Sequence, residues 1–227
     1  MLEAKNLVSG YGALPILHGL SLRVDDNEYV GILGHNGMGK TTLMRTLIGH
    51  ITPMSGSISL DGVPITGAGA HKRARMRIGY VPQGREIFPS LTVRENLMMG
   101  ALSGAEKRGG IVEEVLADFP RLERLLERNG GALSGGEQQL LAIARCLCGR
   151  PRVMLLDEPT EGIQPSIIDE IADLLLAIRK RSSMSIVLVE QNLDFIQALS
   201  DRVLIIHRPM ILVTPRWSTS LWAWGKP

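Results

Sequence analysis

Short apolar runs alternate with amphipathic segments over most of the chain. Runs typical of buried strands lie at residues 153–157, 185–190 and 202–207. Apolar positions at helical spacing occupy residues 166–180 and 193–200. Strands that alternate with helices in this way favour a mostly parallel sheet that is covered on both faces.

The early part of the chain departs from that alternation. Residues 2–8, 20–24 and 29–33 are strand-like and close together. Residues 56–65 add a predicted hairpin, because an Asp-Gly pair suited to a tight turn lies between two strand-like halves. These segments predict an antiparallel layer beside the core sheet.

A second departure lies in the middle of the chain. From about residue 85 to 133 there is no strand pattern, only helical stretches such as 92–102 and 111–127. We therefore expect a helical lobe over about residues 85–148. It is inserted into an α/β domain that extends over residues 1–208.

Length and composition limit the classes of protein that fit. A chain of 227 residues, 44% of them hydrophobic, can bury a large core and corresponds to one domain or one domain with a lobe. The net charge of +2 is too small to argue for nucleic acid, and the basic run 71–77 is interpreted as the exposed face of a short helix. No signal peptide or membrane-spanning run is recognisable, so a soluble chain is expected. Cys146 and Cys148 lie two positions apart in a predicted helix, which predicts free thiols.

A glycine-rich loop, "GHNGMGKTT", follows the strand pattern at 29–33 and precedes a helical pattern. It fits G-x-x-x-x-G-K-[ST], in which backbone N–H groups close around phosphates and the following helix N-terminus adds its positive end. Lys40 is expected to reach the β- and γ-phosphates of a nucleotide, and the Thr41 hydroxyl to bind Mg²⁺. The residues predicted to contact the nucleotide here are Gly34, His35, Asn36, Gly37, Met38, Gly39, Lys40, Thr41 and Thr42.

Two adjacent carboxylates end a later apolar run, "VMLLDE". They lie at the carboxyl end of a predicted strand, where α/β sheets place their ligands. Asp157 suits the Mg²⁺ shell, and Glu158 suits a base that orients or deprotonates an attacking water. With the glycine-rich loop, this pair predicts a site that hydrolyses a nucleotide.

A third motif, "LSGGEQQLLAIARCL" at residues 133–147, opens with a serine and two glycines at a predicted helix start. One subunit has no obvious need for two phosphate-binding helix ends, but two subunits facing each other do. The chain resembles the ATP-binding subunit of an ABC transporter, whose signature is LSGGQ, here with Glu137 in the last place. The resemblance covers about residues 2–208, with the motifs in the family's order. It implies an ABC ATPase core of the P-loop NTPase class.

The resemblance implies roles for further residues. Tyr11 matches the aromatic residue that stacks on adenine, and Gln83 matches a glutamine that senses Mg²⁺ and the γ-phosphate and joins the core to the lobe. Ser134, Gly135 and Gly136 would contact the γ-phosphate bound on the opposite subunit. Hydrolysis would then require a head-to-tail pair of subunits with two ATP molecules between them.

One family residue is missing. Most members carry a histidine that contacts the γ-phosphate after the strand at 185–190, whereas this chain has Gln191. Glutamine donates a hydrogen bond but carries no proton at neutral pH. We therefore predict a working but slower ATPase.

Two further segments narrow the resemblance. "VEQN" together with "PQGREIFPSLTVRENL" looks like the ATPases of branched-chain amino acid importers, and "DEPTEGIQPSII" is most similar to the subunit assigned to urea and short amides. This implies permease subunits, a substrate-binding protein, and a homodimer or a heterodimer with a sister ATPase. It also implies a peripheral position on the cytoplasmic face of the inner (plasma) membrane. The cargo is implied by resemblance only, because none of these residues touches it.

The end of the chain breaks the family pattern. All three tryptophans, Trp217, Trp222 and Trp224, fall in the final eleven residues. Residues 209–227 are therefore interpreted as an atypical tail. It is either a divergent or membrane-touching segment, since tryptophan favours interfaces, or the product of a shifted reading frame.

Three other functions remain open at this level. A phosphotransferase kinase shares the phosphate loop but needs a substrate-binding lobe in place of "LSGGE". A soluble ABC ATPase of DNA repair or translation would add a coiled-coil insertion or tandem ATPase halves, neither of which is evident. A nucleotide-binding module that folds but no longer assembles, because of its tail, is the third.

Overall fold

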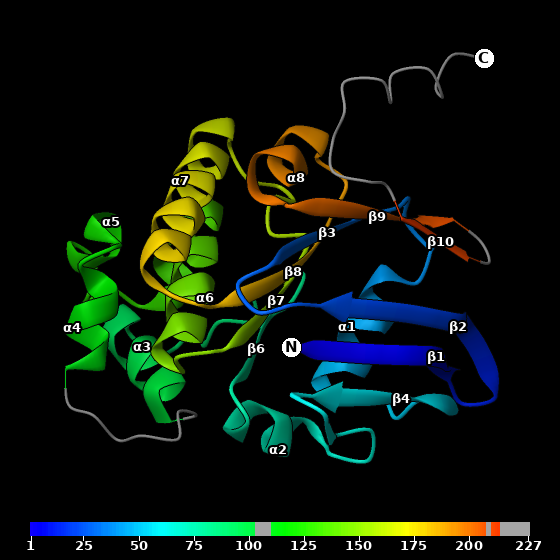
Figure 1. The fold of residues 1–227 in the computed structure, drawn as a ribbon. Helices are drawn as coiled ribbons and strands as arrows, with labels where there is room; N and C mark the ends of the chain where they lie inside the picture. Colours follow the sequence, from blue (N-terminus) through cyan, green and yellow to red (C-terminus); the bar gives the residue numbers. More distant parts are fainter. Residues whose placement is uncertain (103–109, 208–209, 214–227) are drawn as a thin grey trace.

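The computed structural model describes residues 1–102, 110–207 and 210–213, and its strands form two sheets (Figure 1). The larger sheet has six strands in the order β10-β9-β3-β8-β7-β6. Its strands are β3 (Tyr29–Leu33), β6 (Ile78–Val81), β7 (Val153–Asp157), β8 (Ser185–Glu190), β9 (Arg202–His207) and β10 (Met210–Val213). All neighbours pair in parallel except β9 and β10. The predicted core sheet is confirmed.

The smaller sheet is antiparallel, with the order β2-β1-β4-β5. Its strands are β1 (Leu2–Tyr11), β2 (Leu14–Val24), β4 (Ser55–Leu60) and β5 (Val63–Pro64). Asp61 and Gly62 form the predicted hairpin turn, both with positive φ. One expectation needs correction: β3, which we grouped with this layer, lies instead between β9 and β8 in the core sheet. Its residues are buried because both faces are covered.

Helices cover the core sheet on both faces. The helix α1 (Lys40–Ile48) packs with the antiparallel sheet on one face, where Val153 and Leu155 join its core. The helices α6 (Gly135–Cys148), α7 (Pro165–Arg181) and α8 (Leu193–Leu199) pack on the other, where Met154 and Leu156 point. The alternation along β7 follows from the two-residue period of a strand. The α/β class is confirmed.

The lobe lies at the end of the molecule opposite the antiparallel sheet (Figure 1). It contains α3 (Val93–Leu102), α4 (Ile111–Leu116), α5 (Pro120–Glu123), the 3₁₀ turn η1 (Gly130–Ala132) and α6. Between residues 85 and 133 the described part contains no strand. The helical stretch predicted at 111–127 is broken into α4 and α5, because Pro120 cannot continue a helix through its position and instead starts the next one.

The basic run 71–77 is only partly an exposed helix face. The short helix α2 (Ala70–Arg75) exposes His71, Lys72 and Arg75 to solvent, but the side chain of Arg73 is completely buried. Its guanidinium group donates hydrogen bonds to the carbonyls of Thr46 and Leu47 at the end of α1, and to three more at Ile65, Thr66 and Ala68. Arg73 therefore joins α1 to the segment that follows the antiparallel sheet.

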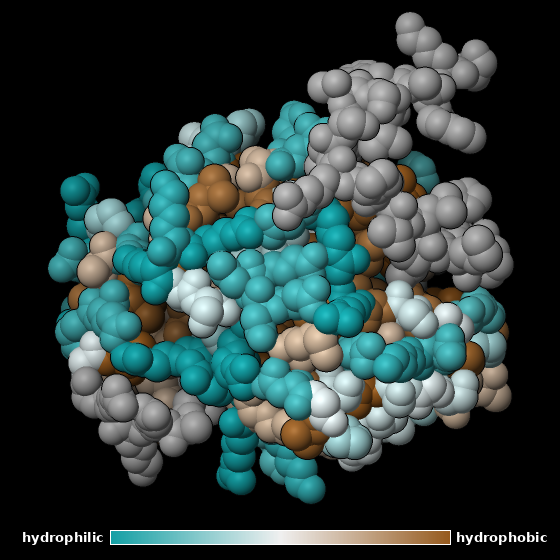
Figure 2. Space-filling model, in the orientation of Figure 1, coloured by the Kyte–Doolittle hydropathy of each residue, from teal (hydrophilic) through white to brown (hydrophobic). Residues whose placement is uncertain are grey.

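The remaining expectations concern cysteines, membrane segments and the tail. Both cysteines are free. No helix among the described residues combines the length and apolar character needed to cross a membrane. Polar side chains cover most of the face seen in Figure 2. Strand β10 falls within the range we assigned to the tail, and the three tryptophans, with both interpretations of them, lie outside the described residues.

Candidate active site

The glycine-rich loop connects the buried strand β3 to the start of α1, as its motif predicts. Gly37 and Gly39 adopt positive φ values of 81° and 89°, which favour glycine. A Cβ atom on Gly39 would also lie 2.9 Å from Leu17 and 3.0 Å from Ile16. The sequence therefore needs glycine here for backbone conformation and for space, and the loop brings its N–H groups to the N-terminus of α1.

Beside this loop lies a cleft of about 390 Å³. It brings together predicted residues from four distant segments: the end of β1, the glycine-rich loop, the loop after β6 and the end of β7. Its lining contains Tyr11, Ile16, Asn36, Gly37, Gly39, Lys40, Thr41, Thr42, Gln83 and Glu158. Ile16 is the one lining residue that the sequence did not indicate.

Lys40 is 4% exposed and is held by three oxygen atoms. Its Nζ donates to the carbonyls of Gly34 and His35, at 2.7 and 3.2 Å, and lies 3.0 Å from Oε1 of Glu158. The carboxylate of Glu158 is itself only 6% exposed. The pair thus places the phosphate-loop lysine directly against the predicted base.

Three of the predicted side chains contact the carboxylate of Glu158. Besides Lys40 at Oε1, its Oε2 accepts from the amide of Gln83 at 3.4 Å and from the amide of Gln191 at 3.2 Å. Gln191 also donates to Oδ1 of Asn36 in the glycine-rich loop, at 2.8 Å. The backbone of Glu158 has a φ of 49°, a conformation rare for residues other than glycine and often associated with functional sites.

Asp157, 1% exposed, ends β7 beside the start of α1. Its Oδ1 lies 3.5 Å from the Thr41 hydroxyl, and its Oδ2 accepts a hydrogen bond of 3.1 Å from the Tyr80 hydroxyl. Burial raises the pKa of the Asp157 carboxyl to about 6, against the opposing effect of the Tyr80 hydrogen bond. The described residues contain no cluster of three or more His, Cys, Asp or Glu side chains suited to a metal. One carboxylate and one hydroxyl are nevertheless the hard oxygen donors that Mg²⁺ accepts alongside phosphate and water.

The sequence did not indicate Glu190, which ends β8 and is 2% exposed. Its Oε1 accepts from the N–H and the hydroxyl of Thr160, at 2.9 and 2.6 Å. Its Oε2 accepts from the N–H groups of Gln191 and Asn192, at 2.8 and 3.0 Å. Glu190 therefore fixes the backbone next to both Glu158 and Gln191. A carboxylate that ends an apolar strand was the available signal, because a buried charge needs several donors.

The signature helix α6 begins as predicted but lies elsewhere. Ser134 and Glu137 form a capping box, and the donation from the Ser134 N–H, at 2.8 Å, lowers the pKa of the Glu137 carboxyl. The guanidinium group of Arg85 packs against Gly135. In the described part of the chain, no residue of α6 lines the cleft beside the glycine-rich loop. Within one subunit, Ser134, Gly135 and Gly136 therefore lie away from the cleft beside the glycine-rich loop. Their predicted contact was with the phosphate on the opposite subunit.

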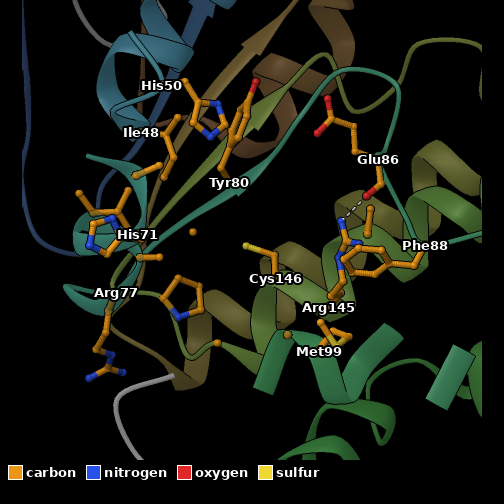
Figure 3. A pocket seen from close by; sticks show the side chains of 18 residues that line it. Ile48, His50, His71, Arg77, Tyr80, Glu86, Phe88, Met99, Arg145 and Cys146 are labelled. Atoms are coloured by element: carbon orange, nitrogen blue, oxygen red, sulfur yellow. Dashed lines mark hydrogen bonds between the residues drawn. The ribbon is translucent and has the colours of Figure 1, made fainter. Parts of the chain in front are cut away.

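A second, larger cleft of about 530 Å³ separates the core from the helical lobe (Figure 3). His50 and Tyr80 lie on its core side, and Phe88, Met99 and Arg145 lie on its lobe side (Figure 3). Arg145 donates to the carbonyl of Glu86 at 2.8 Å and lies 5.1 Å from the centre of the Phe88 ring. This cleft adjoins the loop of Gln83, and Gln83 also lines the cleft beside the glycine-rich loop.

The family model and the similar sequences indicate the same family. Residues 17–161 match the model of the ABC transporter family. The chain is 38% identical to the high-affinity branched-chain amino acid transport ATP-binding protein BraG of Pseudomonas aeruginosa, over 94% of this chain and 91% of the relative. It is 36% identical to the probable branched-chain amino acid transport ATP-binding protein LivF of Archaeoglobus fulgidus (91% and 88%). It is also 36% identical to the lipopolysaccharide export system ATP-binding protein LptB of Escherichia coli K12 (91% and 87%).

The similar solved structures are ATP-binding cassettes of ABC transporters. A nucleotide-free ATP-binding cassette from an ABC transporter superposes with a TM-score of 0.85 at 24% identity, over 96% of this chain and 92% of that one. An ATP-binding cassette of an ABC transporter in its ADP conformation gives a TM-score of 0.81 at 26% identity, over 96% and 91%. At 24% identity, the first similarity shows a shared fold only. The second similarity, at 26% identity, is to a cassette in its ADP conformation.

Proposed function

Because this chain belongs to the ABC transporter family and is an ATPase of its ATP-binding type, we propose that it powers an importer of branched-chain amino acids, urea or short amides. The observation that carries the proposal is the convergence of Lys40, Gln83 and Gln191 on the carboxylate of Glu158. These are the groups that ATP hydrolysis beside a phosphate loop requires.

Each of these side chains has a distinct role. Lys40 binds the β- and γ-phosphates and stabilises the charge that develops on them. Glu158 orients the attacking water and accepts its proton. Gln83 and Gln191 are uncharged donors that orient Glu158, and Gln191 also connects it to Asn36. Tyr11, which is 49% exposed at the edge of the cleft, stacks on the adenine ring.

The donor set around Asp157 fits Mg²⁺. The Thr41 hydroxyl and the Asp157 carboxylate would hold the ion, and Thr41 and Gln83 both line the cleft beside the glycine-rich loop. Mg²⁺ bound here would supply charge neutralisation between the phosphates. Burial raises the pKa of the Asp157 carboxyl, and a cation bound beside it would lower that pKa by favouring the charged form.

The site is completed by a second subunit. Support comes from α6, whose N-terminus carries Ser134, Gly135 and Gly136 but does not line the cleft in its own subunit. In a head-to-tail pair these groups contact the γ-phosphate of the other subunit, because a helix N-terminus with free N–H groups favours anions. The pair is a homodimer or a heterodimer with a sister ATPase. Residues 1–208, with the lobe at about 85–148, form this ABC ATPase unit.

The transport partners follow from the relatives. BraG and LivF are named as ATP-binding proteins of amino acid transport, so transmembrane permease subunits and a substrate-binding protein are the expected partners. The cleft between core and lobe is the surface that would face the permease, with this chain peripheral on the cytoplasmic face of the inner membrane. Closure of the ATPase pair would pull on the permease, and hydrolysis would release it.

The cargo has two importer candidates and one exporter alternative. Amino acid import rests on BraG and LivF, and urea or short amides on the resemblance at residues 157–168. The similarity to LptB favours lipopolysaccharide export as the second function. A soluble ABC ATPase without a transport role is the remaining alternative.

Uptake of labelled leucine and labelled urea by nitrogen-limited cells tests the proposal. Cells with the gene deleted are compared with cells that carry the intact gene or its Glu158→Gln variant. Loss of either uptake in the deletion and the variant, restored by the intact gene, supports an importer and identifies its cargo. If both uptakes persist in the deletion, the importer is refuted, and a concurrent lipopolysaccharide defect would favour export.

A further inference from the structure

Tyr80 connects the cleft between core and lobe to Asp157 beside the glycine-rich loop. Its ring lines the cleft between core and lobe, beside His50 (Figure 3). Its hydroxyl leaves that cleft and donates a 3.1 Å hydrogen bond to Oδ2 of Asp157, next to the glycine-rich loop. No motif in the sequence assigns a role to this tyrosine.

The register of the sheet explains how Tyr80 reaches Asp157. Strands β6 and β7 pair in parallel, with Tyr80 opposite Leu155. Leu155 and Asp157 point to the same face of β7, because they are two residues apart. A long side chain at position 80 on that face can therefore extend along the strands to the carboxylate, and the phenol places a donor at its end.

The two oxygens of Asp157 have different neighbours. Oδ1 lies near the Thr41 hydroxyl, whereas Oδ2 accepts from Tyr80. The carboxylate is 1% exposed, so solvent contributes little to its orientation. The hydrogen bond from Tyr80 thus fixes Oδ2 and leaves Oδ1 beside the Thr41 hydroxyl. Groups behind a metal ligand commonly fix it in this way.

The aromatic ring of Tyr80 contacts the imidazole ring of His50. The two rings meet edge to face, with centres 6.1 Å apart and planes at 79°. His50 follows α1 directly after its C-terminal cap, Gly49, and its side chain is exposed on the cleft wall. His50 at this wall therefore contacts a ring whose hydroxyl donates to Asp157.

We propose that Tyr80 is a positioning residue that orients the Asp157 carboxylate for Mg²⁺ and makes that orientation sensitive to the cleft wall formed with His50. This inference rests on the proposed role of Asp157 in holding the metal. Tyr80 does not line the cleft beside the glycine-rich loop. Its effect is exerted through Asp157.

The test is a Mg²⁺ titration of the full chain with a fluorescent, non-hydrolysable ATP analogue. In Tyr80→Phe the Mg²⁺ concentration for half-maximal binding should rise about tenfold, the usual size of such effects behind a metal ligand. Affinity for the analogue in EDTA should stay unchanged, which separates the effect from general damage to the site. Tyr29→Phe is the matched control, because it removes a buried hydroxyl that donates to the Leu175 carbonyl instead. Equal Mg²⁺ dependence in Tyr80→Phe and the parent would overturn the inference.

Two further variants locate any failure. Asp157→Asn should strongly raise the Mg²⁺ concentration for half-maximal binding of the analogue. If that concentration does not change, the proposed metal role of Asp157 is wrong. If Asp157→Asn responds and Tyr80→Phe does not, only the inference about Tyr80 fails. His50→Ala should raise the Mg²⁺ requirement in the same direction, with no additional effect in the Tyr80→Phe background. Additive effects, or none from His50→Ala, would refute the link to the cleft wall.

Discussion

The ammonium nitrogen of Lys40 lies 3.0 Å from a carboxylate oxygen of Glu158, and the two side chains are 4% and 6% exposed. The residue proposed to bind the phosphates is thereby paired with the residue proposed to activate water. In the proposed function, binding of the phosphates by Lys40 would weaken its contact with Glu158 and free that carboxylate to act as base. This contact would then couple phosphate binding to base activation.

The pair predicts an asymmetric response to mutation. Lys40→Met should abolish ATP binding and destabilise the fold by about 3 kcal/mol, because it leaves a buried carboxylate without its cation. Adding Glu158→Gln should recover much of that stability without recovering ATP binding. Chemical denaturation of the parent, the two single variants and the double variant measures both effects. Equal stability losses in Lys40→Met and the double variant would show that the buried pair does not determine this stability.

Gln191 should limit turnover. Gln191→His should raise kcat, because an imidazole at this position can donate a hydrogen bond and also carry a proton near neutral pH. Gln191→Ala should lower kcat about tenfold, because it removes the donor to Glu158. Steady-state phosphate release measures both. An unchanged rate in Gln191→His would show that this position does not limit hydrolysis.

Arg73 should be critical for stability although it lies outside the active site. Arg73→Met should lower the free energy of unfolding by about 3 kcal/mol, because buried carbonyls at the end of α1 lose their donors. Arg75→Met, an exposed change in the same helix, is the matched control and should have little effect. Urea unfolding compares them, and equal midpoints would contradict the role of Arg73.

Burial raises the pKa of both cysteine thiols, Cys146 and Cys148, to about 12. At pH 8 the folded chain therefore holds little reactive thiolate, and iodoacetamide should modify it roughly a thousandfold more slowly than the urea-unfolded chain. The rate should increase as the pH rises, because deprotonation creates the nucleophile. Mass spectrometry of timed samples measures this. Comparable rates for the folded and unfolded chains would contradict the raised pKa of the two thiols.

The sequence predicted the parts of the site that are formed by contiguous residues. The glycine-rich loop, the Asp157–Glu158 pair and the helix start at Ser134 each require particular residues at fixed spacing, and the structure contains each local feature. Their binding roles remain predictions. The core strands were equally visible, because burial on both faces leaves an uninterrupted apolar run.

Residues whose role depends on distant partners were not predictable in this way. Tyr80 and Glu190 act through strand register, which joins Tyr80 to Asp157 and Glu190 to Thr160 only after the sheet has formed. Arg73 looked like one more exposed charge in a basic run, because its carbonyl partners are scattered along the chain. The grouping of β3 with the antiparallel layer failed for a related reason, since closeness in sequence does not decide which sheet a strand joins.

The most direct test of the account is the size of the Glu158→Gln variant with Mg²⁺ and ATP. If Glu158 is the base of a site completed by a second subunit, this variant binds ATP without hydrolysing it. It should then elute from a sizing column as a dimer with ATP and as a monomer with ADP. Glu161→Gln is the matched control, because Glu161 also contacts Gln83 but is exposed, and its ATP dimer should be transient. A Glu158→Gln variant that binds ATP and remains monomeric would contradict the account.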